Sequence, residues 1–205
     1  MTTTSGDPQQ LSVGEASGRG AVRAYWVAQG GEFLRHHFES ELRSKIEHAF
    51  SSELSSALGG SSLSDWVARS HLVELLEATA KARGGFEPFP DLVAYGEFIQ
   101  RRASNRFTEL LTKILTPELL LRKLPLFWRR DHGSPGNCVI DACAAGSARF
   151  HLEGVHDFPH IGAVWLGWVR AALGSVQARS VELTQSGWSA AKPAVQRVDF
   201  EVSWL

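Results

Sequence analysis

Residues 148–174, ARFHLEGVHDFPHIGAVWLGWVRAALG, decide how the second half of the chain folds. Phe150 and Leu152 alternate with polar or charged neighbours, which is the period of a half-buried β-strand. Asp157 and Pro159 then open a helix whose apolar residues continue to Gly174. A strand followed directly by an apolar helix predicts a sheet with a helix packed against it.

Strand patterns lie on both sides of this stretch. Residues 138–144 and 148–155 are predicted to form a hairpin whose turn contains Gly146. Residues 176–184 and 195–204 are predicted to form two more strands, and in the last one every second residue is apolar. The order of hairpin, helix and hairpin is typical of a mostly antiparallel sheet with one crossover helix.

The first half of the chain has mainly helical patterns. Residues 21–28 are rich in β-formers and predict a first strand. Apolar residues at helical spacing predict helices over 32–58, 64–83, 91–115 and 118–124. Residues 126–136 are predicted to connect these helices to the strands that follow. The predicted fold class is α+β, with an N-terminal strand and helical bundle packed on a C-terminal, mostly antiparallel sheet with one crossover helix.

The composition suits one globular domain. The 205 residues are 43% hydrophobic and 21% charged. We predict a disordered lead over 1–18 and a single domain over 19–205, with a helical half (32–130) and a sheet half (137–205). The net charge of −1 argues against a nucleic-acid partner. No apolar run approaches the roughly 20 residues of a membrane span, and no signal peptide is evident, so we expect a cytoplasmic protein.

A family resemblance is carried by four short segments together with the helical pattern across most of 20–205. The segments are Phe150–Gly154, Asp157–Pro159, Ala171–Gly174 and Phe200–Trp204. They resemble a myxobacterial family of roughly 200-residue proteins of unknown function, distantly similar to 4-vinyl reductase and heme nitric-oxide-binding domains. The resemblance implies a small-molecule pocket or a dimer surface between helices and sheet.

The chain departs from both distant groups in residues that hold cofactors. Residues 176–205 contain neither the cysteines nor the histidine that domains similar to 4-vinyl reductase carry near the last hairpin. Heme nitric-oxide sensors bind the heme propionates through a Tyr-x-Ser-x-Arg motif, and neither Tyr25 nor Tyr95 begins one. We therefore predict no cofactor from the residues themselves, and a heme or a small apolar ligand only under the sensing hypothesis below.

Histidines provide the candidate metal and heme ligands. His151, His156 and His160 form the densest cluster of such side chains, but their spacing matches no zinc signature, so a metal is not favoured. The alternative is that Asp157 caps a helix and the histidines are surface or hydrogen-bonded residues. His37 and His48 are eleven residues apart and would share one side of a helix, which is a weak basis for heme ligation.

Arginines and one tryptophan are the candidate binding residues. Clustered guanidinium groups can bind a nucleotide or an acidic partner, although a solvated helix face paired with glutamates is the alternative. Trp188 lies in a polar loop and is a candidate anchor at a partner or oligomer interface, unless it packs back over the sheet edge. The arginines in question are Arg101, Arg102, Arg106, Arg129 and Arg130.

Nucleophilic chemistry has little support in the sequence. Cys138 and Cys143 differ in parity, so in a regular strand they would point to opposite faces and could pair only across a bulge. Both are expected to fill the core, with a reactive Cys138 as the alternative because it follows a basic loop. Nucleophile-elbow, phosphate-loop, dinucleotide and zinc-protease motifs are all missing from the sequence. The sequence therefore favours a protein that is not an enzyme.

Two functions follow from these observations. The first hypothesis is a non-enzymatic cytoplasmic module for regulation, signalling or protein interaction, which binds a partner protein and can form a homodimer. The alternative is a small-molecule-sensing domain that holds an apolar ligand or heme in a pocket between helices and sheet.

Overall fold

The computed structural model describes residues 20–60, 62–82, 84, 89–103, 115–133, 136–155, 158, 160–187 and 197–205. The predicted lead over 1–18 and residues 104–114 of the predicted helix 91–115 lie outside these residues, as do Arg106, His156, Asp157, Pro159 and Trp188. Within the described part of the chain, no helix is both long and apolar enough to span a membrane.

The helical half begins with a short strand. The strand β1 (Ala21–Arg23) pairs antiparallel with β2 (Trp66–Ala68). The helices of this half are α2 (Ala24–His37), α3 (Ser40–Glu47), α4 (Ser52–Gly60), α5 (Arg69–Ala82), α6 (Pro90–Ala103), α8 (Pro117–Arg122) and α9 (Leu124–Asp131).

Four predicted boundaries in this half are wrong. The predicted helix over 64–83 begins only at Arg69, because Trp66–Ala68 pair with β1 as a strand. Only 21–23 is extended, because the chain turns into α2 at Ala24. The predicted helix over 32–58 is the end of α2 followed by two more helices. The first break is at Phe38, which is extended, and the second precedes Ser51, whose Oγ accepts a hydrogen bond from the Leu54 amide at 3.1 Å. Residues 124–131 form α9, which Pro125 opens as a first-turn proline.

The sheet half contains four antiparallel strands in the order β3-β4-β6-β5. They are β3 (Asn137–Ala144), β4 (Ser147–Glu153), β5 (Glu182–Gly187) and β6 (Arg197–Ser203), and α10 (Ile161–Ser175) connects β4 to β5. The prediction placed the third strand at 176–184, six residues too early. Gln177 and Ser180 have φ values of 64° and 49°, which prevent an extended strand there.

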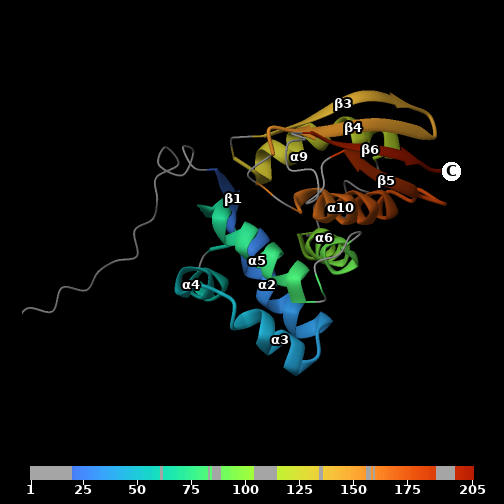
Figure 1. Ribbon diagram of the computed structural model, residues 1–205. Coiled ribbons are helices and arrows are strands. Elements are labelled where there is room, and N and C mark those ends of the chain that lie inside the picture. The colour runs from blue at the N-terminus through green and yellow to red at the C-terminus, as the bar shows by residue number, and fades with distance from the viewer. Residues whose placement is uncertain are drawn as a thin grey trace, which may run out of the picture.

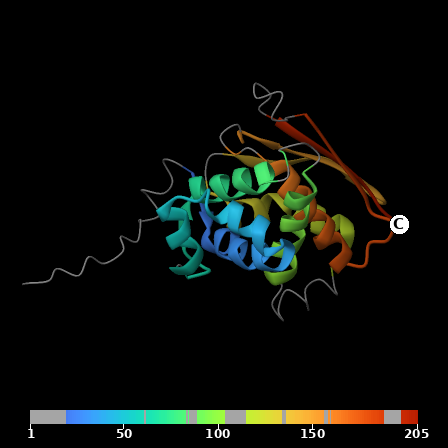
Figure 2. The same ribbon diagram turned by 60° about the horizontal axis from the view of Figure 1, so that its bottom comes forward.

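The buried core is one cluster that runs from the helical half to the space between the sheet and α10. Phe150 and Phe200 stack with ring centroids 4.8 Å apart on the inner face of the sheet. The helix α10 lies under this face, and α6 lies beneath α10 (Figure 1). Figure 2 shows the same two helices side by side from another direction. The outer face carries polar and charged residues. The α+β class and the crossover helix are confirmed.

Candidate functional site

A groove of about 610 Å³ lies where α6, α10 and β5 meet. Its position, between helices and sheet, is the one that the sensing hypothesis requires. Its middle is apolar and its ends are polar. The apolar lining comes from Phe89, Val93, Ala94, Ala163, Leu166 and Leu183, and the polar lining from Glu97, His160, Arg170, Thr184 and Gln185.

Two glycines fix how α6 and α10 meet beside this groove. A Cβ atom on Gly96 would lie 1.9 Å from the carbonyl oxygen of Val164, and one on Gly167 would lie 1.9 Å from that of Val93. The two helix backbones are therefore in direct contact. At Gly162 an added Cβ would lie 2.7 Å from Nε2 of the Gln185 side chain, so α10 and β5 meet there through a side chain. The wall formed by α6 and α10 is held by backbone packing, which makes that wall stiff.

Two residues with unusual backbone conformations meet at one end of the groove. Phe89 and His160 have φ values of 51° and 66°, in the left-handed region that side chains other than glycine rarely adopt. Their rings are in edge contact, with centroids 4.8 Å apart. Such strained positions persist where the surrounding structure enforces them and are concentrated at ligand sites.

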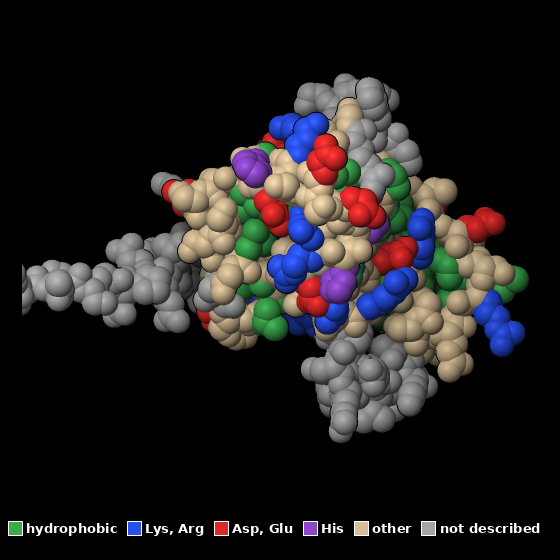
Figure 3. Space-filling model, turned by 90° about the horizontal axis from the view of Figure 1, so that it is seen from below, with side chains coloured by type: hydrophobic (Ala, Val, Ile, Leu, Met, Phe, Trp, Pro, Cys, Tyr) green, Lys and Arg blue, Asp and Glu red, His purple; other side chains and the backbone are tan. Residues whose placement is uncertain are grey.

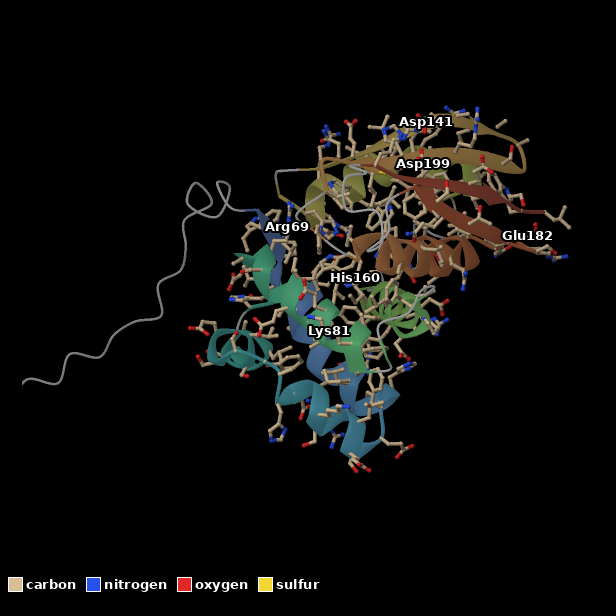
Figure 4. The ribbon with its side chains drawn as sticks, viewed as in Figure 1. Arg69, Lys81, Asp141, His160, Glu182 and Asp199 are labelled. Atoms are coloured by element: carbon tan, nitrogen blue, oxygen red, sulfur yellow. The ribbon has the colours of Figure 1, made fainter. Side chains whose placement is uncertain are left out.

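His160 is the titratable group at this end. Burial lowers its pKa, while the charge of Glu77 acts to raise it and that of Lys81 to lower it. Figure 4 shows His160 at the start of α10, facing the helical half that carries Lys81. The imidazole is therefore neutral at physiological pH and can donate or accept a hydrogen bond.

The other end of the groove is charged. The Arg170 guanidinium lies 3.6 Å from Oε1 of Glu97, and Oε2 of the same carboxylate accepts a hydrogen bond of 2.9 Å from Arg101. Arg101, a predicted binding residue, thus adjoins the groove through Glu97. Glu97 was expected only as an acidic partner of the arginines, and Arg170 was not singled out, because a single Arg on a helix carries no local signal.

Of the remaining predicted arginines, the three in the described part of the chain lie on two helices, Arg102 on α6 and Arg129 and Arg130 on α9. Arg102 pairs with Glu32, and Arg130 forms hydrogen bonds of 2.6 and 2.8 Å to Asp131, while Arg129 is exposed on α9. Figure 3 shows basic and acidic side chains interspersed on the face seen from below. Arg102 and Arg130 thus have acidic partners, as in the paired, solvated alternative.

The weak metal candidates are separated by the sheet. His151 lies on the outer face, with Nδ1 2.9 Å from Oδ2 of Asp141, whereas His160 lines the groove beside the inner face. His156 is outside the described residues. Sequence reasoning missed Asp141 and Asp199 as neighbours of His151.

The cysteines share a face of the sheet, so the parity expectation is wrong. A β-bulge lies between Ile140 and Ala142, and Cys138 and Cys143 are opposite Leu152 and Ala148, which point to the same side. Both thiols are free. Burial raises the pKa of Cys138 to about 12, so it is not a ready nucleophile.

The interior between the two halves is where the sensing hypothesis would place a heme. His132 is buried there, and neither ring nitrogen has a hydrogen-bond partner. However, Trp26 and Trp128 have ring centroids 4.7 and 4.3 Å from the His132 ring, and Phe158 and Trp165 have centroids 5.8 and 5.9 Å away.

These aromatic side chains occupy the space around the imidazole that a porphyrin ring would need. His37 instead hydrogen-bonds Asp91 at 2.8 Å, and His48 is exposed. The described residues between the two halves therefore do not fit a heme.

Comparison with known proteins gives a fold but no family. No family model and no curated protein matches the sequence. An Fe(II) unliganded H-NOX protein of K. algicida is similar in structure with a TM-score of 0.65, 14% identity, and coverage of 89% of this chain and 96% of that chain.

Two further solved structures are similar to this chain in fold. An H-NOX protein of S. oneidensis in the Fe(II)NO ligation state has a TM-score of 0.61 and 11% identity, covering 90% of this chain and 99% of that chain. A mutant H-NOX protein of T. tengcongensis has a TM-score of 0.57 and 7% identity, covering 89% and 97%. The resemblance to heme nitric-oxide-binding domains is thus confirmed at the level of fold, while the myxobacterial family stays a prediction. This chain has the fold of the H-NOX proteins.

Proposed function

We propose that this chain is a small-molecule-sensing domain and that its ligand binds in the groove between α6, α10 and β5. The observation that carries the proposal is the contact of Phe89 with His160, two strained residues at one end of a groove with one stiff wall. The fold likeness to H-NOX proteins, which were solved in Fe(II) unliganded and Fe(II)NO states, supports sensing over the interaction module.

The groove predicts the chemical character of the ligand. His160 and Arg170 are ten residues apart along α10, or about 15 Å at the helical rise. Between them, Ala163 and Leu166 present apolar side chains. An elongated small molecule with an apolar body and a polar or anionic head near Arg170 suits this arrangement.

Heme is not the ligand that we propose. The interior between the two halves is filled by indole rings around His132, and the Tyr-x-Ser-x-Arg motif is missing from the sequence. We expect the purified protein to lack the intense visible absorption of a heme. A stoichiometric heme in native mass spectra, with such absorption, would overturn this part of the proposal.

The groove is tested by filling it. We expect an anilinonaphthalene sulfonate dye to bind the wild-type protein with enhanced fluorescence, since it combines an apolar ring system with an anionic group. Ala163→Phe narrows the groove and should weaken binding about tenfold or more, whereas Arg170→Gln should weaken it less. Ser56→Phe, on the exposed side of α4, is the matched control. Equal dye binding by Ala163→Phe and wild type would contradict the assignment.

A further inference from the structure

A group of ligand-type side chains lies on the outer face of the sheet, away from the groove. Asp141, His151 and Asp199 each offer a ligand atom, and these atoms all lie within 4.8 Å of one another. They come from β3, β4 and β6, and Figure 4 shows the two aspartates on the outer side of the sheet. Three adjacent strands thus deliver one side chain each to the same point.

The strand register explains how the three side chains meet. His151 is directly opposite Asp199 in the β4–β6 pairing. Asp141 occupies the bulge of β3, where the register with β4 shifts, so it is an additional side chain on the face that carries His151. Bulges commonly redirect a side chain toward a functional site.

The imidazole of His151 is buried although it lies on the polar face. Its side chain is only 6% exposed. Nδ1 is 2.9 Å from Asp141, but the nearest acidic group to Nε2 is Oε2 of Glu153 at 3.7 Å, beyond hydrogen-bond distance. A buried imidazole with a carboxylate near each ring nitrogen can supply one nitrogen ligand to a cation.

The charges around His151 are unbalanced. Asp141, Glu153 and Asp199 surround the imidazole, and among the described residues Arg197 is the one permanent cation in ion-pair contact with them. Arg197 contacts Asp199 at 2.6 Å and Asp141 at 3.4 Å, and its own side chain is 49% exposed. The Arg197 guanidinium therefore lies where a bound metal ion would lie, and it can move into solvent.

We propose that Asp141, His151 and Asp199 bind a divalent transition ion of the zinc type. One imidazole nitrogen and carboxylate oxygens are a ligand set that Zn²⁺ accepts, and Glu153 is close enough to supply a fourth ligand. The side chains of Asp141 and Asp199 are 33% and 35% exposed, which gives the ion a path to the site from solvent. Arg197 moves aside when the ion binds.

The first test measures binding to the full chain after treatment with a chelator. Calorimetric titration with ZnCl2 at neutral pH should show one equivalent bound, and Co²⁺ should develop the visible absorption of a low-coordinate site. His151→Gln and Asp199→Asn should each weaken Zn²⁺ binding about tenfold or more. His48→Gln and Glu182→Gln remove a histidine and a carboxylate elsewhere and should bind as the wild type does.

Substitution of Arg197 should change the Zn²⁺ affinity in the opposite direction. Arg197→Met removes the competing positive charge, so it should tighten Zn²⁺ binding about tenfold. A structural ion-pair network would instead lose stability in this variant without gaining affinity. Circular dichroism confirms folding of each variant. The proposal is overturned if the wild type shows no saturable one-equivalent binding, if His151→Gln binds equally well, or if Arg197→Met does not bind more tightly.

Discussion

Gly96 and Gly167 make equivalent close contacts, Gly96 with the backbone of α10 and Gly167 with the backbone of α6. A Cβ atom added to either glycine would lie 1.9 Å from a carbonyl oxygen of the other helix. No side chain can relieve such an overlap, because the obstacle is backbone. The packing of the helical half against the sheet half therefore depends on these two positions.

Gly96→Ala and Gly167→Ala should each lower the free energy of unfolding by about 3 kcal/mol, through forced separation of the helices. Gly174→Ala is the control, because nothing lies within 4 Å of its added Cβ. It should leave stability unchanged or raise it by up to about 1 kcal/mol, as alanine favours a helix. Urea unfolding followed by tryptophan fluorescence measures the three variants, and equal stability in all of them would contradict the close contact.

His132 should make the protein sensitive to mild acid. Burial, followed by the charges of Arg69 and Arg130, lowers the pKa of His132 well below 6.5. Below pH 6.5 the unfolded chain takes up a proton there that the folded chain does not. Stability contributed by this group is therefore fully present above the unfolded pKa and falls by about 1.4 kcal/mol per pH unit as the pH drops below it.

His132→Phe should remove this component of the pH dependence. Phenylalanine keeps the aromatic contacts and has no unpaired ring nitrogens, so the variant should be about 1 kcal/mol more stable than wild type at pH 7. The difference should grow toward pH 5.5. Unfolding curves at the two pH values measure it, and a difference that shrinks on acidification would contradict the assignment.

The two cysteines should differ in reactivity. Cys138 is 5% exposed and burial raises its pKa to about 12, whereas Cys143 is partly exposed, with its thiol 3.7 Å from the carbonyl oxygen of Glu118. Iodoacetamide at pH 8 should therefore label Cys143 of the native protein and leave Cys138 unlabelled. Peptide mass spectrometry distinguishes the sites, and urea-unfolded protein, in which both should react, is the control.

Ser51 should anchor α4 to α5. Its Oγ accepts a hydrogen bond from the Leu54 amide and donates one of 2.9 Å to Oε2 of Glu74. Ser51→Ala removes both bonds and should cost about 1–2 kcal/mol of stability. Ser55→Ala, which loses a single helix-surface bond to the Ser51 carbonyl, should cost less. Thermal unfolding midpoints compare the two, and a larger loss for Ser55→Ala would be evidence against the capping role.

The parts of the fold that could be predicted are those set by local periodicity. The alternation through Phe150 and Leu152 places β4, and the continuous apolar run after Pro159 places α10, because each element buries a face that its own residues define. The break at Phe38 could not be predicted, since Phe38 is apolar, is buried and fits the helical spacing that it interrupts.

The candidate site could not be assembled from the sequence for a related reason. Its walls come from residues near 89–97, 160–170 and 183–185, which only tertiary packing brings together. The sequence did contain one signal of this packing, because glycines inside helical patterns, such as Gly96 and Gly167, often mark the close approach of another backbone. The prediction that Cys138 and Cys143 point to opposite faces was wrong for the same reason. The bulge between them arises from strand pairing, and it reverses the alternation of side chains over these six residues.

Asp141 is the residue of β3 that has no partner in β4, although the seven other residues of β3 each have one. The hairpin would therefore keep every cross-strand pair if Asp141 were deleted. Deletion of a single codon can thus remove the carboxylate beside His151, and insertion of one can add it, while the cross-strand pairs are unchanged. Among related chains, those with the carboxylate beside His151 should therefore have a β3–β4 hairpin one residue longer than those without it.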